Sequence, residues 1–184
     1  MTEYLELFEF ETVNMRDVHA VTTLTFYDGI APVEYLQKRV CEIFALNPWL
    51  DSCLKTKNGK VTLEYRSAVE SYETAERFKS SGGHKITVLE PFEVSDLLSE
   101  NDLKDHNYFK PLEKYIVKKG RQCVDADEPL FKLTVLTLSE SKFALLYSLS
   151  HTIVDGYTYY VLYNMLSVSV SPTALIATRV MEYV

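Results

Sequence analysis

Two long apolar runs, separated by four polar residues, constrain the fold of this chain more than any other feature. The first run spans Leu130 to Leu138 and the second spans Phe143 to Leu149. Consecutive apolar strands joined by a short polar turn form an antiparallel hairpin. Because the second run holds almost no polar residue, it predicts a strand that is covered on both faces.

A strand and a helix are expected ahead of this hairpin. The segment Val18 to Tyr27 is rich in β-branched and aromatic residues and predicts a strand. Apolar residues then recur at helical spacing from Val33 to Leu46. Pro32 stands at the expected first helical position, a place that proline favours. Asn47 should end the helix, because the residue before a proline is pushed out of the α region.

The next segment predicts a second hairpin. Asn58-Gly59 stands between two strand-like runs, Asp51 to Thr56 and Lys60 to Arg66. An Asn-Gly pair in that position is the strongest short-range hairpin signal. Further along, His84 to Leu89 predicts a short strand.

The middle of the chain is less regular, and two helices are predicted there. They cover Val69 to Lys79 and Lys110 to Lys119. Tyr157 to Leu166, after the central hairpin, predicts a buried helix. The order of elements indicates an α+β fold, a two-layer sandwich with a mixed, mostly antiparallel sheet and helices packed on it. We expect residues 1–166 to form one domain and residues 167–184 a poorly structured or truncated tail.

Composition excludes several classes of function. The net charge of −7 and the scattered lysines argue against a nucleic-acid-binding surface. No apolar run approaches the ~20 residues that span a bilayer, and the acidic N-terminus lacks the basic start of a signal peptide. Three cysteines without paired spacing predict neither a zinc site nor a disulfide framework. We therefore expect a cytoplasmic protein with no transmembrane segment.

The residues that follow the central hairpin are the candidate site. His151 comes directly after the apolar strand, and Asp155-Gly156 breaks the pattern before the next helix. A histidine between a buried strand and a helix can be held rigidly while its ring faces a cleft, which suits a general base. A lone histidine at a strand end is more often structural, and Asp-Gly alone is often a plain turn. A metal site is disfavoured, because no third ligand lies nearby in the sequence.

His151-x-x-x-Asp155-Gly156, after an apolar strand and before an apolar helix, resembles the active-site motif of the coenzyme-A-dependent acyltransferase superfamily. That superfamily includes chloramphenicol acetyltransferase, the BAHD and alcohol acyltransferases, and condensation domains. Leu46 to Asp51 also approximates the helix stop of the N-terminal lobe in its two-lobed members, without the usual arginine. Many members carry two adjacent histidines, and here Ser150 occupies the first position.

The resemblance implies a chemistry and a set of roles. His151 would be the catalytic base that acts directly on the acceptor, a hydroxyl or an amine. The donor would be an acyl-CoA, used as a cosubstrate, or an acylated carrier protein; no bound cofactor and no metal are implied. Asp155 would be structural, pairing with an arginine for which Arg16, Arg39 and Arg121 are candidates. Gly156 would allow a close approach of a substrate or another strand.

The length of the chain leaves two interpretations open. Two-lobed members carry a second, similar lobe, and 184 residues leave no room for it. The resemblance therefore implies an N-terminal lobe alone, whose site a second lobe or a second copy of the chain would complete. The alternative is a non-catalytic fragment or interaction module that keeps the acyltransferase fold.

Overall fold

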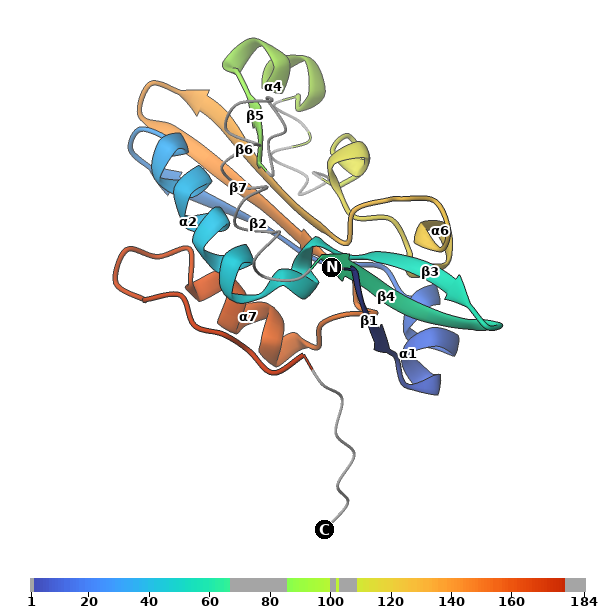
Figure 1. The fold of residues 1–184 in the computed structure, drawn as a ribbon. Helices are drawn as coiled ribbons and strands as arrows, with labels where there is room; N and C mark the ends of the chain where they lie inside the picture. The colour runs from blue at the N-terminus through green and yellow to red at the C-terminus, as the bar shows by residue number, and fades with distance from the viewer. Residues whose placement is uncertain (1, 67–85, 100–101, 103–108, 178–184) are drawn as a thin grey trace.

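A four-stranded sheet forms the centre of the protein in a computed structural model (Figure 1). Its strand order is β2 (Val21–Asp28), β7 (Lys142–Leu149), β6 (Phe131–Ser139) and β5 (Ile86–Leu89). The structure describes residues 2–66, 86–99, 102 and 109–177.

The central hairpin is confirmed. Strands β6 and β7 pair antiparallel, with Phe131 opposite Leu149, and β2 pairs antiparallel with the other edge of β7. Only β5 runs parallel to its neighbour, β6. The sheet is therefore mixed and mostly antiparallel, as predicted. All of β7 is buried except Lys142 at its start, which agrees with a strand covered on both faces.

Two helices cover one face of this sheet. They are α2 (Val33–Leu46) and α7 (Gly156–Asn164), which lie together on one side in Figure 1. Helix α2 occupies the predicted residues, and its buried positions follow helical spacing. Helix α7 is only partly buried, because Tyr157 is 79% exposed. The prediction of a buried helix there is correct for one face only.

The opposite face packs against α4 (Pro91–Leu97), a helix that the sequence analysis did not identify. Val94 and Leu98 join Leu136 of β6 and Leu146 of β7 in a second hydrophobic cluster. The sheet thus has apolar packing on both faces, as its buried strands require.

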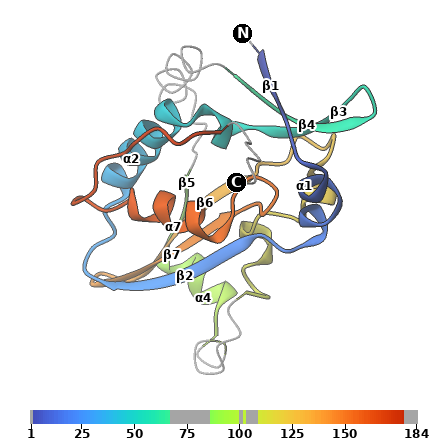
Figure 2. The same ribbon diagram turned by 90° about the horizontal axis from the view of Figure 1, so that it is seen from below.

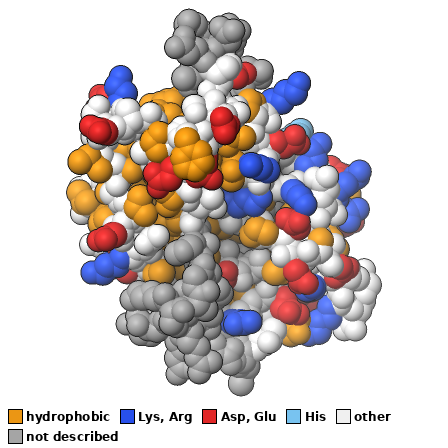
Figure 3. Space-filling model, turned by 90° about the horizontal axis from the view of Figure 1, so that it is seen from above, with side chains coloured by type: hydrophobic (Ala, Val, Ile, Leu, Met, Phe, Trp, Pro, Cys, Tyr) orange, Lys and Arg blue, Asp and Glu red, His pale blue; other side chains and the backbone are white. Residues whose placement is uncertain are grey.

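Seen from above, the molecule shows hydrophobic side chains gathered on one part of its surface and mixed charges on another (Figure 3).

A second, three-stranded antiparallel sheet lies beside the first. Its order is β1 (Thr2–Glu6), β4 (Lys60–Arg66) and β3 (Cys53–Lys57). The predicted hairpin β3–β4 is confirmed, because Asn58 and Gly59 both have positive φ, 52° and 76°. Strand β1 and the short helix α1 (Glu9–Val13) were not anticipated.

The helix expected from Lys110 to Lys119 is wrong. That segment holds only the short 3₁₀ helix η3 (Glu113–Tyr115), and the chain is extended at Ile116. The extended backbone is held by side chains of the sheet: Val117 N–H donates to Ser148 Oγ at 3.0 Å, and Lys132 Nζ donates to two carbonyls of the segment. These tertiary bonds replace the bonds that a helix would make within itself. The helix predicted from Val69 to Lys79 lies outside the described residues.

Three further short helices lie between the strands. They are η1 (Met15–Asp17), η2 (Pro48–Asp51) and α6 (Gly120–Cys123). Residues 171–177 form neither helix nor strand, and they run along α2 (Figure 2). In the part of the chain that the structure describes, no helix has the length and apolar character needed to cross a membrane.

Candidate functional site

His151 stands in the tight connection between β7 and α7. Ser150 N–H donates to the carbonyl of Leu130 at 2.9 Å, which ties the end of β7 to the start of β6. The chain then turns, and Ile153 N–H donates to the Ser150 carbonyl at 3.1 Å. His151 is half-buried, and its neighbours in the turn are buried: Ser150, Thr152, Ile153 and Val154. The turn therefore presents the histidine side chain toward the surface from a fixed backbone.

Asp155 begins helix α7. Its carboxylate accepts the backbone N–H of Thr158 at 2.7 Å, which is a standard N-cap contact. This hydrogen bond is the largest cause of the lowered pKa of Asp155, and the nearby His151 lowers that pKa further by a smaller amount. The carboxylate is therefore ionised at neutral pH.

After the β7–α7 turn, the first residues of α7 are anchored by Tyr159, which is fully buried. Its hydroxyl donates to the carbonyl of Tyr147 at 2.9 Å and lies 2.8 Å from the hydroxyl of Thr23. Burial raises the pKa of Tyr159 to about 12. On the next turn of α7, Tyr163 donates to Thr25 at 2.8 Å. Helix α7 is thus bonded to both β7 and β2.

His151 lines a cavity of about 590 Å³. Asp155, Tyr157 and Val161 extend the same wall along α7. The other walls come from three separate places: the N-terminal segment, η2 and the residues after α7. They are Phe8, Phe10, Glu11, Met15, Trp49, Ala174, Leu175, Ile176 and Ala177. The site therefore joins segments that are far apart in the sequence.

The N-terminal wall was missed by the sequence analysis. Glu11 is buried and its Oε2 accepts the backbone N–H of Phe8 at 2.7 Å, which closes the first turn of α1. A glutamate three residues after the N-cap is a known capping signal. Here the N-cap is Phe8 and not Ser, Thr or Asp, so the usual sequence pattern is incomplete. Phe8 and Phe10 stack with ring centroids 5.8 Å apart.

One buried side chain, that of Asn47, bonds the wall after α7 to the end of α2. Its amide nitrogen donates to the carbonyl of Thr173 at 2.9 Å, and its oxygen accepts the N–H of Leu175 at 2.7 Å. The same nitrogen donates to the Ile43 carbonyl at the end of α2. Asn47 thereby acts as a short piece of backbone that pairs with residues 173–175. We call residues 171–177 the strap.

Asp155 does not make the arginine pair that the resemblance implies with any of the three candidates. Arg121 pairs with Asp17 at 2.5 Å, and Arg39 pairs with Glu42 at 3.6 Å. Arg16 has a buried Nε with no hydrogen-bond partner in the described chain. In place of an ion pair, Asp155 caps α7 and lines the cavity.

The two glycines nearest the site differ in their surroundings. No described atom lies within 4 Å of the position that a Cβ of Gly156 would take, and its φ is not positive. Within this chain, Gly156 therefore faces open space. A Cβ at Gly120 would lie 2.5 Å from Thr152 Oγ1 and 2.8 Å from Arg16 Cα. Gly120 is required by the close approach of α6 to the turn that holds His151.

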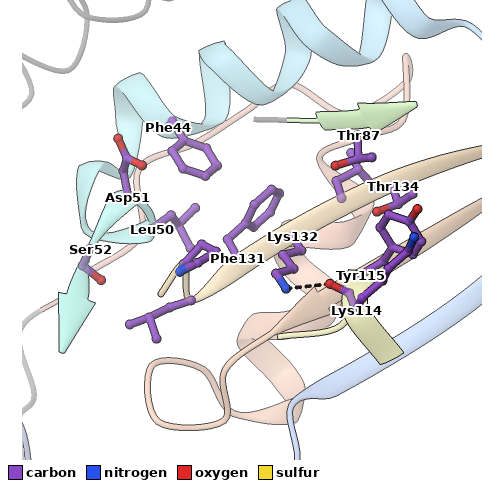
Figure 4. Close-up of a pocket in the computed structure, with 13 residues that line it drawn as sticks. Phe44, Leu50, Asp51, Ser52, Thr87, Lys114, Tyr115, Phe131, Lys132 and Thr134 are labelled. Atoms are coloured by element: carbon purple, nitrogen blue, oxygen red, sulfur yellow. Dashed lines mark hydrogen bonds between the residues drawn. The ribbon is translucent and has the colours of Figure 1, made fainter. Parts of the chain in front are cut away.

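A second cavity, of about 370 Å³, lies beside the start of β6 (Figure 4). Phe44 and Leu50 line it from one side, and Thr87 and Thr134 from the other (Figure 4). Lys132 donates to the carbonyl of Lys114 at 3.1 Å, and burial lowers the pKa of its ammonium group. None of the three motif residues lines this cavity, so the candidate site is the cavity at His151.

Comparison with solved structures identifies the fold. No protein-family model and no curated protein sequence matches this chain. The starter condensation domain of rhizomide synthetase RzmA matches with a TM-score of 0.59 at 12% identity, over 89% of this chain and 36% of that one. F. graminearum TRI101, solved with ethyl coenzyme A, matches with a TM-score of 0.60 at 9% identity, over 90% of this chain and 38% of that one.

A third match is the condensation domain that mediates chain release from the enacyloxin polyketide synthase. It has a TM-score of 0.53 at 18% identity, over 86% of this chain and 27% of that one. The chain thus spans between about a quarter and two fifths of the length of these structures. It has the fold of part of a condensation domain and of part of TRI101.

Proposed function

We propose that this chain is the base-bearing lobe of an acyltransferase, with His151 as the general base. The observation that carries the proposal is the position of His151: it lies half-buried in the wall of a 590 Å³ cavity, on the turn between β7 and α7. Fold similarity to acyltransferases supports the same assignment. Residues 1–166 would form the lobe, and residues 167–184 would form a tail that contributes one wall of the cavity through residues 174–177.

The proposed reaction moves an acyl group from a thioester to a hydroxyl or an amine. A neutral His151 imidazole takes the acceptor proton as the acceptor attacks the thioester carbonyl carbon. The carbon–sulfur bond then breaks, and the leaving thiolate takes that proton back from the imidazolium. Such general-base catalysis contributes roughly 10²–10⁴-fold to a rate.

The donor would be an acyl-CoA or an acylated carrier protein. TRI101 was solved with ethyl coenzyme A, which supports a coenzyme A thioester as the cosubstrate. The open space at Gly156 would receive a substrate, a second lobe or a second copy of the chain. We assign the protein to the cytoplasm, where acyl-CoA is available and its three cysteines would stay reduced.

The proposal is tested by following release of free thiol from acyl-CoA donors in the presence of a panel of alcohols and amines. His151→Ala should lower the rate by roughly 10²–10⁴-fold without loss of folded structure. His19→Ala is the matched control, because His19 is exposed and does not line the cavity. Thiol release that is equally fast in His151→Ala would overturn the assignment of the base.

The alternative function is a non-catalytic module that keeps the acyltransferase fold. The chain spans under two fifths of the length of these two structural matches. Gel filtration alongside the assay separates the two functions. Absence of thiol release from a folded chain, as a monomer and in any oligomer that it forms, would establish the alternative.

A further inference from the structure

The cavity beside the start of β6 lies at the edge of the central sheet (Figure 4). Strand β5 pairs with β6 only from Leu133 onward, so within the described chain no strand covers this edge at Phe131 and Lys132. Successive residues of a strand point to opposite faces of the sheet. The cavity is therefore lined by side chains of both faces, and its volume of about 370 Å³ suits one small ligand.

One face of the sheet gives the cavity an apolar wall. Phe131 and Leu133 belong to the same hydrophobic cluster as Phe44 of α2. Phe44 and Phe131 pack edge to face, with ring centroids 4.9 Å apart. Leu50 of η2 lines the cavity on the same side. An apolar group that binds against this wall is removed from water, which favours its binding.

The other face gives the cavity a positive charge. Lys132 is half-buried, and its ammonium group donates to the carbonyls of Lys114 at 3.1 Å and Ile116 at 2.9 Å. An ammonium group has three N–H donors, so these two bonds leave one. Carbonyl groups do not neutralise the charge, and among the described residues no carboxylate makes an ion pair with Lys132.

The carboxylates nearest to this cavity leave the charge of Lys132 largely unbalanced. Burial is the largest effect on the pKa of Lys132 and lowers it. Glu128 acts on that pKa in the opposite direction, but its carboxylate pairs with Lys118 at 2.7 Å. Asp51 lines the cavity from η2, at an exposed position where water and salt screen its charge. An anion bound beside Lys132 would favour its charged form.

We propose that this cavity binds a small monocarboxylate with an apolar tail, such as hexanoate. The carboxylate accepts the third N–H of Lys132, and the tail lies against Phe44, Leu50 and Phe131. A hydrogen bond between two charged groups is about twice as strong as one between neutral groups. The described residues that line this cavity and those that line the cavity at His151 do not overlap, so the site is separate from the proposed acyl transfer.

Calorimetry on the full chain with three ligands of equal length tests the inference. Hexanoate, hexanol and hexylamine share one tail and differ in the head group, which is a carboxylate, a hydroxyl or an ammonium. We expect hexanoate to bind roughly tenfold more tightly than hexanol, and hexylamine to bind most weakly. Acetate keeps the carboxylate without the tail and should bind at least roughly tenfold more weakly than hexanoate. Added salt should reduce the advantage of hexanoate over hexanol.

Variants of Lys132 assign the preference to its charge. Lys132→Met removes the charge and keeps a long unbranched side chain, so it should bind hexanoate and hexanol about equally. Lys132→Arg keeps the charge and should keep the preference. Lys142→Met is the matched control, because Lys142 is an exposed residue of the neighbouring strand β7 that does not line the cavity. A preference for hexanoate that persists in Lys132→Met would overturn the inference.

Amide chemical shifts of the unchanged protein locate the ligand even if a variant of Lys132 does not fold. Hexanoate should shift the amides of Phe131 and Lys132, and those of Asp155 and Tyr157 in the cavity at His151 should stay in place. Shifts at the His151 cavity alone, equal binding of hexanoate and hexanol, or no binding of hexanoate would overturn the inference. None of these measurements follows thiol release, so failure of this site and failure of the acyl transfer are distinguishable.

Discussion

Two walls of the same cavity are held in different ways. The wall that carries His151 is bonded at several points: Ser150 to Leu130, Asp155 to Thr158, and Tyr159 to both neighbouring strands. The strap on the other side is attached near the cavity by the amide of Asn47. A wall bonded at several points keeps its position when one bond is lost, whereas the part of the strap at residues 173–175 depends more on the single side chain of Asn47.

The two walls of the cavity would have different effects on the reaction. The groups that would act on the reacting atoms stand on the wall with many bonds, where a small displacement would be most costly to the rate. The strap contributes only apolar and small side chains, Ala174 to Ala177, and its Ile176 is 88% exposed. Its position would therefore affect which acceptors fit more than how fast they react.

The largest effect is expected from Gly120→Ala. The new methyl group would lie 2.5 Å from Thr152 Oγ1 and 2.8 Å from Arg16 Cα, and a backbone atom cannot turn aside as a side chain can. Overpacking of this kind costs about 3 kcal/mol of unfolding free energy and should displace the turn that holds His151. Chemical denaturation measures the loss of stability, and thiol release measures the loss of the site.

Gly156→Ala is the matched control for that substitution. It adds the same methyl group on the same connection, where no described atom lies within 4 Å, and alanine favours the first turn of α7. We expect unchanged or slightly increased stability. A loss of stability equal to that of Gly120→Ala would show that the close packing at Gly120 is not what holds the wall.

The next effect is expected from Asn47→Ala, which tests how much the Asn47 side chain contributes to holding the strap. The substitution removes three hydrogen bonds and should cost about 2 kcal/mol, since the groups left behind regain only part of their bonding from water. Hydrogen exchange at the Leu175 amide measures loss of the bond to Asn47, because this amide donates to the Asn47 side-chain oxygen. We expect its protection to be lost.

Arg39→Ala is the comparison for Asn47→Ala. Arg39 donates to the carbonyl of Val170 at 2.8 Å, at a more exposed point that does not line the cavity. The Leu175 amide should stay protected in this variant. If it is lost equally in both, the strap is held along its whole length and the contrast between the two walls is wrong.

Asn47 also illustrates what the sequence could and could not predict. Asn47 followed by Pro48 correctly predicted where α2 ends, because that signal is local. The bonds from its side chain to Thr173 and Leu175 join residues more than 120 positions apart, and no local pattern encodes them. The central hairpin was predictable for the same reason as the helix end, since each strand is apolar along its own length.

The site follows the same rule. His151 and Asp155 were found because a strand, a polar break and a helix follow one another in the sequence. Glu11 and Trp49 were not, because only the fold brings the N-terminal segment and η2 to His151. The arginine pair expected for Asp155 is not made because the fold places the candidates elsewhere: Arg121 pairs with Asp17 and Arg39 pairs with Glu42.

A smaller effect is expected from Tyr159→Phe, which tests the redundancy of the His151 wall. The variant loses the bonds to Tyr147 and Thr23 but keeps the buried ring, and should cost about 1 kcal/mol of unfolding free energy. Because the bonds of Ser150 and Asp155 remain, thiol release should change less than twofold. Tyr163→Phe, which removes a more exposed hydroxyl, should cost less. A large loss of activity in Tyr159→Phe would mean that one bond positions the wall.

The smallest effect, and the one that depends on pH, is expected from Asp155→Asn. The folded protein lowers the pKa of Asp155, so the ionised carboxylate contributes stability that is fully present above the ordinary value of about 3.9. That contribution is lost as the pH falls through the lowered value. Asparagine can still accept the Thr158 N–H but carries no charge at the start of α7, so the variant should be less stable by under about 1 kcal/mol at neutral pH.

Unfolding free energies of the two proteins, measured between about pH 6 and pH 2, should therefore converge as the pH falls. Asp155→Ala provides the second reference, because it removes the cap as well as the charge and should cost about 1 kcal/mol at neutral pH. Parallel profiles of the unchanged protein and Asp155→Asn would mean that the carboxylate gains nothing from its charge in the fold. Asp155 would then hold the His151 wall only through the geometry of its hydrogen bond.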